Sequence, residues 1–279
     1  MTLDVVAFAG HGCVRLASGA GAAIVSTSVG PRVIGLYRSG DEDNVLAVLP
    51  DAAIDRDGGP PYRLLGGHRL WAAPEVPGIT YQPDDRPCAV TEVDDGVRVE
   101  APADGAGLIK SIEVRRSDDG WTVDHSVRNV SGTTVTLAPW AITQLPLGGR
   151  MLVPSSTHAP GPQADRALVL WPYTDPSDAR LRLTADMVVV DAVASGSRLK
   201  VGVAPSSGRA SYERKGTVLE KRIDVHADAP HADRGAAIQV YLSDEFCELE
   251  TLGPLREGPP DGVAAHRERW IVRPAQDER

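Results

Sequence analysis

The sequence predicts an all-β protein, a large antiparallel sandwich or barrel. Apolar residues recur at every second position in short runs, and clusters of Gly, Pro, Asp and Ser separate these runs at about 8–12-residue intervals. The 28 Gly and 22 Pro residues suit the many turns of such a fold. Helical periodicity is almost absent. We therefore expect one domain over residues 1–279, with a loose tail at 277–279.

Strand-like runs follow one another along most of the chain. Two turns carry strong hairpin signals, Asp94-Asp95-Gly96 and Ser117-Asp118-Asp119-Gly120. Frequent prolines between positions 139 and 176 predict loops that lie over the sheets. A last short strand, Trp270–Val272, is expected to close an edge. The strongest runs before the proline-rich region are Cys13–Ala17, Ala22–Thr27, Arg32–Tyr37, Cys88–Val93, Leu108–Arg116 and Trp121–Asn129.

The charge balance and the cysteines limit the classes of partner. Lys and Arg number 29 against 38 Asp and Glu, a formal charge of -9, which argues against nucleic acid or an anionic membrane as partner. The three cysteines are an odd number without paired spacing, so we expect reduced thiols. No signal peptide and no bilayer-spanning stretch is recognisable, so a cytoplasmic protein is expected. Composition leaves the oligomeric state open.

The strand Phe246–Pro254 carries two acids at alternate positions. In an extended chain, side chains i and i+2 share a face about 7 Å apart, so Glu248 and Glu250 are expected side by side. Phe246 and Leu252 share that face and would bracket them. A carboxylate in apolar surroundings has a raised pKa and can transfer protons near neutrality. The alternative is a solvated strand face.

The segment 66–75, reading GGHRLWAAPE, combines side chains that suit a sugar site. An aromatic ring such as that of Trp71 can stack on a sugar, Arg69 can bind oxygens, and His68 can transfer a proton. Glu75 adds an acid. The alternative is a loop in which Arg69 pairs with Glu75 and Trp71 fills the core.

Polar side chains also interrupt the apolar faces of two neighbouring strands, Lys110 on one and His125 on the other. They could line a cleft and bind substrate, or they could be satisfied core residues. Trp140 is a candidate stacking platform and Gln144 a candidate amide for binding hydroxyls. His158 and Trp171, in the proline-rich region, are candidates for a pocket rim. No metal motif stands out, and no metal site is expected.

Three stretches resemble the galactose mutarotase-like superfamily, the large β-supersandwich. They are IVSTSVGPRVIGLYRSGDEDNVL (24–46), WTVDHSVRNVSGTTVTLAPW (121–140) and ELETLGP (248–254). The resemblance covers most of the chain at the level of pattern, and is greatest for a branch with GGHRLW and ELETLGP segments. It implies that Glu250 or Glu248 is the base that removes the anomeric proton. The acid histidine of the family has no counterpart at residues 140–144, so His68 is expected to replace it, with His125 as second choice.

We therefore expect a cofactor-independent acid–base enzyme of the mutarotase or epimerase type. Its partner would be a small, carbohydrate-like molecule, a sugar or a hydroxylated ring. Three alternatives remain. One is a non-catalytic carbohydrate-binding module, another is a biosynthetic isomerase, cyclase or lyase that uses the same cleft, and the third is a structural or partner-binding β domain with no small ligand.

Overall fold

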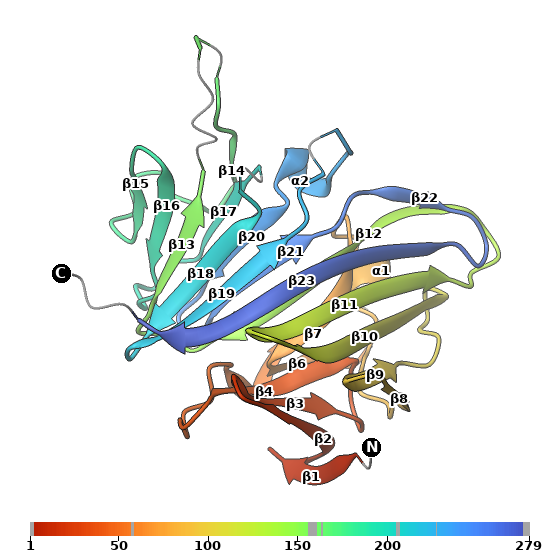
Figure 1. The fold of residues 1–279 in the computed structure, drawn as a ribbon. Coiled ribbons are helices and arrows are strands. Elements are labelled where there is room, and N and C mark those ends of the chain that lie inside the picture. The colour runs from red at the N-terminus through yellow and green to blue at the C-terminus, as the bar shows by residue number, and fades with distance from the viewer. Residues whose placement is uncertain are drawn as a thin grey trace.

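A computed structural model describes residues 3–56, 59–155, 161–162, 164–204, 207–226 and 228–275. His158 and the predicted loose tail at 277–279 lie outside the described residues. Nearly all regular secondary structure in the described chain is antiparallel β, as predicted, and the strands form two large sheets (Figure 1).

The first sheet carries the acidic strand near its middle. Its order is β1-β2-β3-β4-β7-β12-β21-β20-β17-β14, and β22 also pairs with β12. The strands are β1 (Asp4–Phe8), β2 (His11–Ser18), β3 (Gly21–Ser26), β4 (Arg32–Arg38), β7 (His68–Ala73), β12 (Val135–Leu145), β14 (Leu168–Leu170), β17 (Leu199–Val203), β20 (Ile238–Leu242), β21 (Cys247–Leu252) and β22 (Arg256–Gly258).

The second sheet has the order β15-β16-β13-β18-β19-β23-β11-β10-β9-β8. Its strands are β8 (Ala89–Val93), β9 (Gly96–Glu100), β10 (Leu108–Ser117), β11 (Gly120–Asn129), β13 (Arg150–Pro154), β15 (Leu181–Leu183), β16 (Met187–Asp191), β18 (Arg209–Arg214), β19 (Thr217–Ile223) and β23 (Val263–Pro274). A separate pair is formed by β5 (Val48–Ile54) and β6 (Tyr62–Gly66), and the two short helices are α1 (Pro77–Thr80) and α2 (Ala232–Gly235).

Both predicted hairpins are present, between β8 and β9 and between β10 and β11. The prediction that Trp270–Val272 closes an edge is wrong. These residues belong to β23, a strand of 12 residues between β19 and β11 in the interior of the second sheet (Figure 1). Sequence periodicity does not reveal this strand because two of its inward-facing side chains, His266 and Glu268, are polar and buried.

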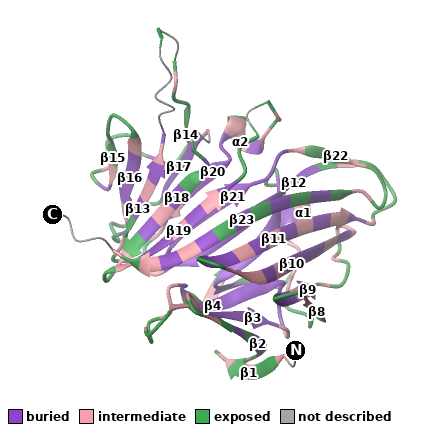
Figure 2. Cartoon of the chain, in the orientation of Figure 1, coloured by how far each residue is buried: buried purple, intermediate pink, exposed green. Residues whose placement is uncertain are grey.

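The main core lies between the two sheets. It contains Leu70 and Leu249 from the first sheet together with Val123 and Trp270 from the second. Along β23 and β11, buried residues alternate with more exposed ones (Figure 2). A second apolar cluster covers the opposite face of the first sheet and contains no residue of the second sheet; its members include Trp71, Trp140, Phe246 and Leu252. The first sheet is therefore covered on both faces around β7, β12 and β21.

A left-handed bend leads from β6 into β7. Leu65, Gly66 and Gly67 have φ values of 59°, 83° and 75°. A Cβ on Gly67 would lie 2.3 Å from the carbonyl oxygen of Val33. The Gly67 amide donates a hydrogen bond of 2.8 Å to Ala47, which fixes the bend against the loop before β5. This bend sets the position of the strand that carries Arg69.

Gly67→Ala is expected to lower the free energy of unfolding by about 3 kcal/mol or more, because a left-handed φ and a backbone clash act together. Urea unfolding followed by tryptophan fluorescence measures it. Gly216→Ala is the matched control, since Gly216 has a φ of 73° and a Cβ added there would meet nothing within 4 Å. It should lose only about 1–2 kcal/mol, the cost of the left-handed backbone. Equal losses for both variants would contradict the role of close packing.

No helix in the described parts of the chain is long and apolar enough to cross a membrane.

Candidate active site

A cleft of about 1410 Å³ opens on the face of the first sheet that points away from the second sheet. The small β5–β6 pair provides one wall, since residues 48–55 line the cleft. The sheet itself provides the floor, with side chains from β7, β12, β17, β20 and β21. Among the candidate residues from the sequence, those that line the cleft are Arg69, Trp71, Glu75, Trp140, Trp171 and Glu248.

Strand β21 presents its two acids as predicted. Glu248 pairs with Gln144 of β12 across the ladder, and Glu250 pairs with Ile142. Residues directly opposite in an antiparallel pair share a face, so both acids are on the cleft side of the sheet. Phe246 belongs to the apolar cluster on that side. The two acids nevertheless differ in depth, because Glu248 lines the cleft whereas Glu250 is fully buried beneath it.

Glu248 is held by two donors through one of its oxygens. Arg69 Nη2 and Gln144 Nε2 each donate to Glu248 Oε1 over 3.0 Å. The Arg69 guanidinium also lies over the Trp71 ring, 4.3 Å from its centroid. Its Nε and Nη1 atoms are buried without a partner among the described residues, as is Gln144 Oε1. Arg69 therefore pairs with Glu248 and not with Glu75, and it retains hydrogen-bonding capacity beside the cleft.

Glu250 has a different environment. Its Oε2 accepts hydrogen bonds from Trp140 Nε1 over 2.7 Å and from Lys200 Nζ over 3.0 Å. Its Oε1 is buried without a partner among the described residues. Burial raises the pKa of Glu250, the ammonium of Lys200 opposes this rise, and the nearby charge of Glu248 adds to it, so that the pKa lies at about 7. Glu250 can therefore gain or lose a proton near neutral pH.

Lys200 completes this group, and sequence reasoning missed it. It lies on β17, lines the cleft, and has its Nζ 4.7 Å from the centroid of the Trp140 ring and 4.8 Å from that of Trp171. In the sequence it alternates with Leu199 and Val201, so it resembles an ordinary solvent-facing lysine. Only the pairing of β17 with β20, and of β20 with β21, brings it to Glu250.

The predicted pairing of His68 with Glu250 is wrong. His68 and Arg69 are consecutive on β7, so their side chains point to opposite faces of the sheet. Arg69 faces the cleft, and His68 faces the core between the sheets, where it is fully buried. Because the sheet separates His68 from Glu250, these two groups cannot act on one substrate.

His125, the second choice for the acid, also lies in the inter-sheet core. His68 Nε2 and His125 Nε2 are 2.7 Å apart. His125 Nδ1 lies 3.2 Å from the backbone oxygen of His266, which can only accept, so Nδ1 carries the proton and Nε2 of His125 accepts from His68. His68 Nδ1 lies 2.9 Å from the hydroxyl of Thr143, which accepts from Lys221 over 2.8 Å. Each ring nitrogen of His68 and His125 thus has a partner.

Glu268 anchors the other end of this network. It forms a 2.6 Å ion pair with Lys221 and accepts from Trp270 over 2.7 Å. His68, His125 and Glu268 have ligand atoms within 4.8 Å of one another. Two imidazole nitrogens on a tetrahedral zinc would lie about 3.3 Å apart, given zinc–nitrogen bonds of about 2.0–2.1 Å. The 2.7 Å separation fits a hydrogen bond better, so we interpret these residues as a buried network that ties the sheets together.

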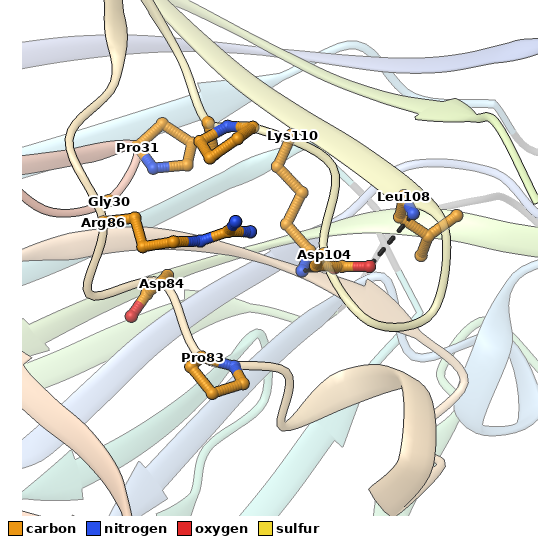
Figure 3. A pocket seen from close by; sticks show the side chains of 10 residues that line it. Gly30, Pro31, Pro83, Asp84, Arg86, Asp104, Leu108 and Lys110 are labelled. Atoms are coloured by element: carbon orange, nitrogen blue, oxygen red, sulfur yellow. Dashed lines mark hydrogen bonds and ion pairs between the residues drawn. The ribbon is translucent and has the colours of Figure 1, made fainter.

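Lys110 is also absent from the cleft. Its Nζ forms a 2.6 Å ion pair with Asp104, and both side chains line a small pocket at the base of β10 (Figure 3). Leu108 donates its backbone N–H to the same carboxylate over 3.0 Å. The substrate-binding roles predicted for Lys110 and His125 are therefore not supported by their positions. Lys110 is paired with Asp104 at the edge of the core, and His125 belongs to the buried network.

The remaining candidates lie around the cleft. Trp71 and Trp140 form an edge-to-face pair with centroids 5.4 Å apart. Gln144 is buried at the floor and holds Glu248. Glu75 is exposed at the rim and accepts a hydrogen bond from Tyr81. Trp171 lines the cleft, as predicted for a rim residue. The cleft therefore combines aromatic side chains, a guanidinium that holds a carboxylate, and two carboxyl groups in different environments.

Comparison with known proteins identifies the fold. No family model and no curated protein sequence matches the chain. A galactose mutarotase-like protein from Lactobacillus casei matches with a TM-score of 0.62 and 10% identity, over 94% of this chain and 100% of that one. A galactose mutarotase-like protein from Clostridium acetobutylicum matches with a TM-score of 0.55 and 13% identity, over 98% and 99%. An aldose 1-epimerase candidate from Escherichia coli K12 gives 0.56 and 14%, over 94% and 99%.

These three structures match nearly the whole chain at low identity, so they establish the architecture and not the chemistry. The resemblance expected from the sequence is confirmed at this level: the chain has the galactose mutarotase-like fold.

Proposed function

We propose that the protein is a carbohydrate-active, cofactor-independent acid–base enzyme that opens and recloses a cyclic hemiacetal, as in anomer interconversion. One observation carries the proposal: two carboxyl groups of one strand, Glu248 and Glu250, occupy contrasting environments at the floor of a tryptophan-lined cleft. Paired titratable groups whose surroundings differ in this way are a common basis for dividing acid and base roles.

Glu248 takes the role of base in this proposal because it is the carboxylate that lines the cleft. Arg69 and Gln144 hold one of its oxygens and fix the position of the carboxylate. Arg69 orients the Glu248 carboxylate toward the ring, while Trp71 or Trp140 stacks against the C–H face of the ring. These contacts would place the anomeric hydroxyl at Glu248.

Lys200 takes the role of acid, in place of His68. Its ammonium lines the cleft and is held by Glu250. The anomeric hydroxyl and the ring oxygen of a hemiacetal are bonded to the same carbon, so the two groups must line the same cleft, as Glu248 of β21 and Lys200 of β17 do. Glu248 removes the hydroxyl proton, Lys200 protonates the ring oxygen, and the C–O bond of the ring breaks to give the open aldehyde. Reclosure returns both protons.

Glu250 supports Lys200 from below. With a pKa of about 7, it can exchange a proton with Lys200 after Lys200 has given its own away. Its second hydrogen bond, from Trp140, fixes the carboxyl and thereby the ammonium. Proton transfer of this kind needs two positioned groups and no cofactor.

Lys200→Arg separates the charge of this residue from its acidity. Arginine can keep the ion pair with Glu250, but its guanidinium does not release a proton at neutral pH. We expect a roughly 10- to 100-fold decrease in kcat for anomer interconversion, measured by NMR exchange on a panel of free aldoses, with a smaller change in KM.

Wild-type protein that accelerates interconversion of no aldose would contradict the proposal. If it still bound sugars, a carbohydrate-binding module would be favoured, with Trp71 and Trp140 as the binding surface. If kcat were unchanged in Lys200→Arg, the assignment of Lys200 as the acid would be wrong, while the rest of the proposal would stand.

A further inference from the structure

We infer that the ligand of this cleft is a sugar that carries an uncharged apolar substituent, with a separate subsite for that substituent along β5. The inference rests on the proposed function for the sugar end only. The substituent subsite depends on the size, polarity and charge of the rest of the cleft.

Size is the first observation. Small-molecule sites usually have volumes of about 300–1,000 Å³ for ligands of drug size. The cleft has about 1410 Å³, and the proposed acid–base groups occupy only one part of its floor. A single sugar ring at Glu248 and Lys200 would leave the β5 wall without a partner. The cleft therefore has room for a group attached to the ring.

The β5 wall is chemically different from the floor. Six of the eight wall residues, 48–55, are apolar; the other two are aspartates. Leu49, Ala52 and Ile54 are half-buried and pack against the cluster that contains Trp71 and Trp140. Val48 is 42% exposed. Apolar side chains of β5 therefore continue the apolar cluster of the tryptophans toward the outer wall.

The charges argue against an anionic substituent. Six acidic and three basic side chains line the cleft. Two of the three basic residues, Arg69 and Lys200, already pair with Glu248 and Glu250. Asp51 and Asp55 lie on the β5 wall itself. A phosphate, sulfate or carboxylate on that side would meet net negative charge, so the substituent is expected to be uncharged.

The test uses pairs of glycosides that differ only in the alkyl group. Methyl β-D-glucosides, β-D-galactosides and β-D-mannosides that carry either a hexyl or a methyl ether on O6, away from the anomeric centre, are titrated into the wild-type protein below the micellar concentration, with calorimetry as readout. We expect at least one hexyl compound to bind about tenfold or more tightly than its methyl partner, because each buried CH₂ favours binding. Glycosides cannot interconvert anomers, so the result does not depend on catalysis.

Val48→Asp is expected to reduce the preference for the hexyl compound to less than threefold without changing the affinity for its methyl partner. Val263→Asp is the matched control, because Val263 is 57% exposed, lies on β23 and does not line the cleft. It should keep the wild-type ratio. Hexyl-to-methyl ratios near one for every sugar would overturn the inference, as would tighter binding of maltotriose than of any hexyl compound. Neither result would bear on the anomer interconversion that tests the proposed function.

Discussion

Glu248→Gln is expected to lower kcat for anomer interconversion by about 10²- to 10⁴-fold, the usual contribution of a positioned proton-transfer group. Glutamine keeps the shape of the side chain and can still accept from Arg69 and Gln144, so substrate binding should change little. It cannot take the proton of the anomeric hydroxyl. NMR exchange rates give kcat, and calorimetry with a non-reacting methyl glycoside gives the binding constant.

Glu75→Gln is the matched control in the same cleft. Glu75 lies at the rim and contacts Tyr81, away from the Arg69 and Lys200 pairs, so its kcat should stay within a few-fold of wild type. Comparison with Glu250→Gln decides between the two acids. If Glu250→Gln abolished turnover while Glu248→Gln left it intact, the assignment of Glu248 as base would be wrong.

The shared face of the two acids can be predicted from the sequence because it depends on a single strand. Glu248 and Glu250 are two residues apart, and the period of a β-strand places them on one face whatever the neighbours are. Phe246 and Leu252 follow by the same rule, and the structure places all four on the cleft side. The fold class is predictable for a related reason, since alternation and turn signals are local.

The partner of the base is not predictable in this way. His68 and Arg69 belong to a segment whose paired glycines and proline suggest a loop, and a loop imposes no alternation. Once the segment is known to be β7, their opposite directions follow, and His68 cannot share a site with Arg69. Lys200 comes to Glu250 through two non-local strand pairings, which periodicity within β17 does not contain.

The buried histidine side chains of this protein belong to the core between the sheets and not to the cleft. His68, His125 and His266 are buried between the sheets, and desolvation is the largest cause that lowers the pKa of each. A neutral imidazole can both donate and accept, so it can link Thr143 to a backbone carbonyl without adding a buried charge. The only net charges in this group are those of Lys221 and Glu268, among the residues described, and they are paired.

Glu268→Gln is expected to lower the free energy of unfolding by about 3–5 kcal/mol, because it leaves the Lys221 ammonium buried without an opposite charge. Both side chains are completely buried, and the ion pair measures 2.6 Å. Urea unfolding at pH 7 gives the loss. Glu220→Gln on β19 is the matched control, since Glu220 pairs with Arg222 and Arg273 near the surface and should cost about 0–1 kcal/mol.

Adding Lys221→Met to Glu268→Gln should recover part of the loss, because the unpaired charge is then gone. Equal losses for Glu268→Gln and Glu220→Gln would show that the network contributes no more than a surface pair. Recovery in the double variant separates an unpaired charge from simple misfolding, in which a second core substitution would only add to the damage.

The same network determines how stability depends on pH. Burial lowers the folded-state pKa of His266 to about 3 and lowers those of His68 and His125, so below pH 6.5 the unfolded chain binds protons that the folded chain does not. Glu250 has the opposite effect. Its pKa is raised from 4.5 to about 7, so it binds its proton more readily in the folded state, and its contribution to stability is lost as the pH rises from 4.5 to 7. Three histidines outweigh one carboxyl between pH 4.5 and 6.5, so wild-type stability should fall on acidification. A free energy of unfolding that stayed constant or rose from pH 6.5 to 4.5 would mean that the histidines take up protons inside the fold, and the buried network would then have to rearrange around the new charges.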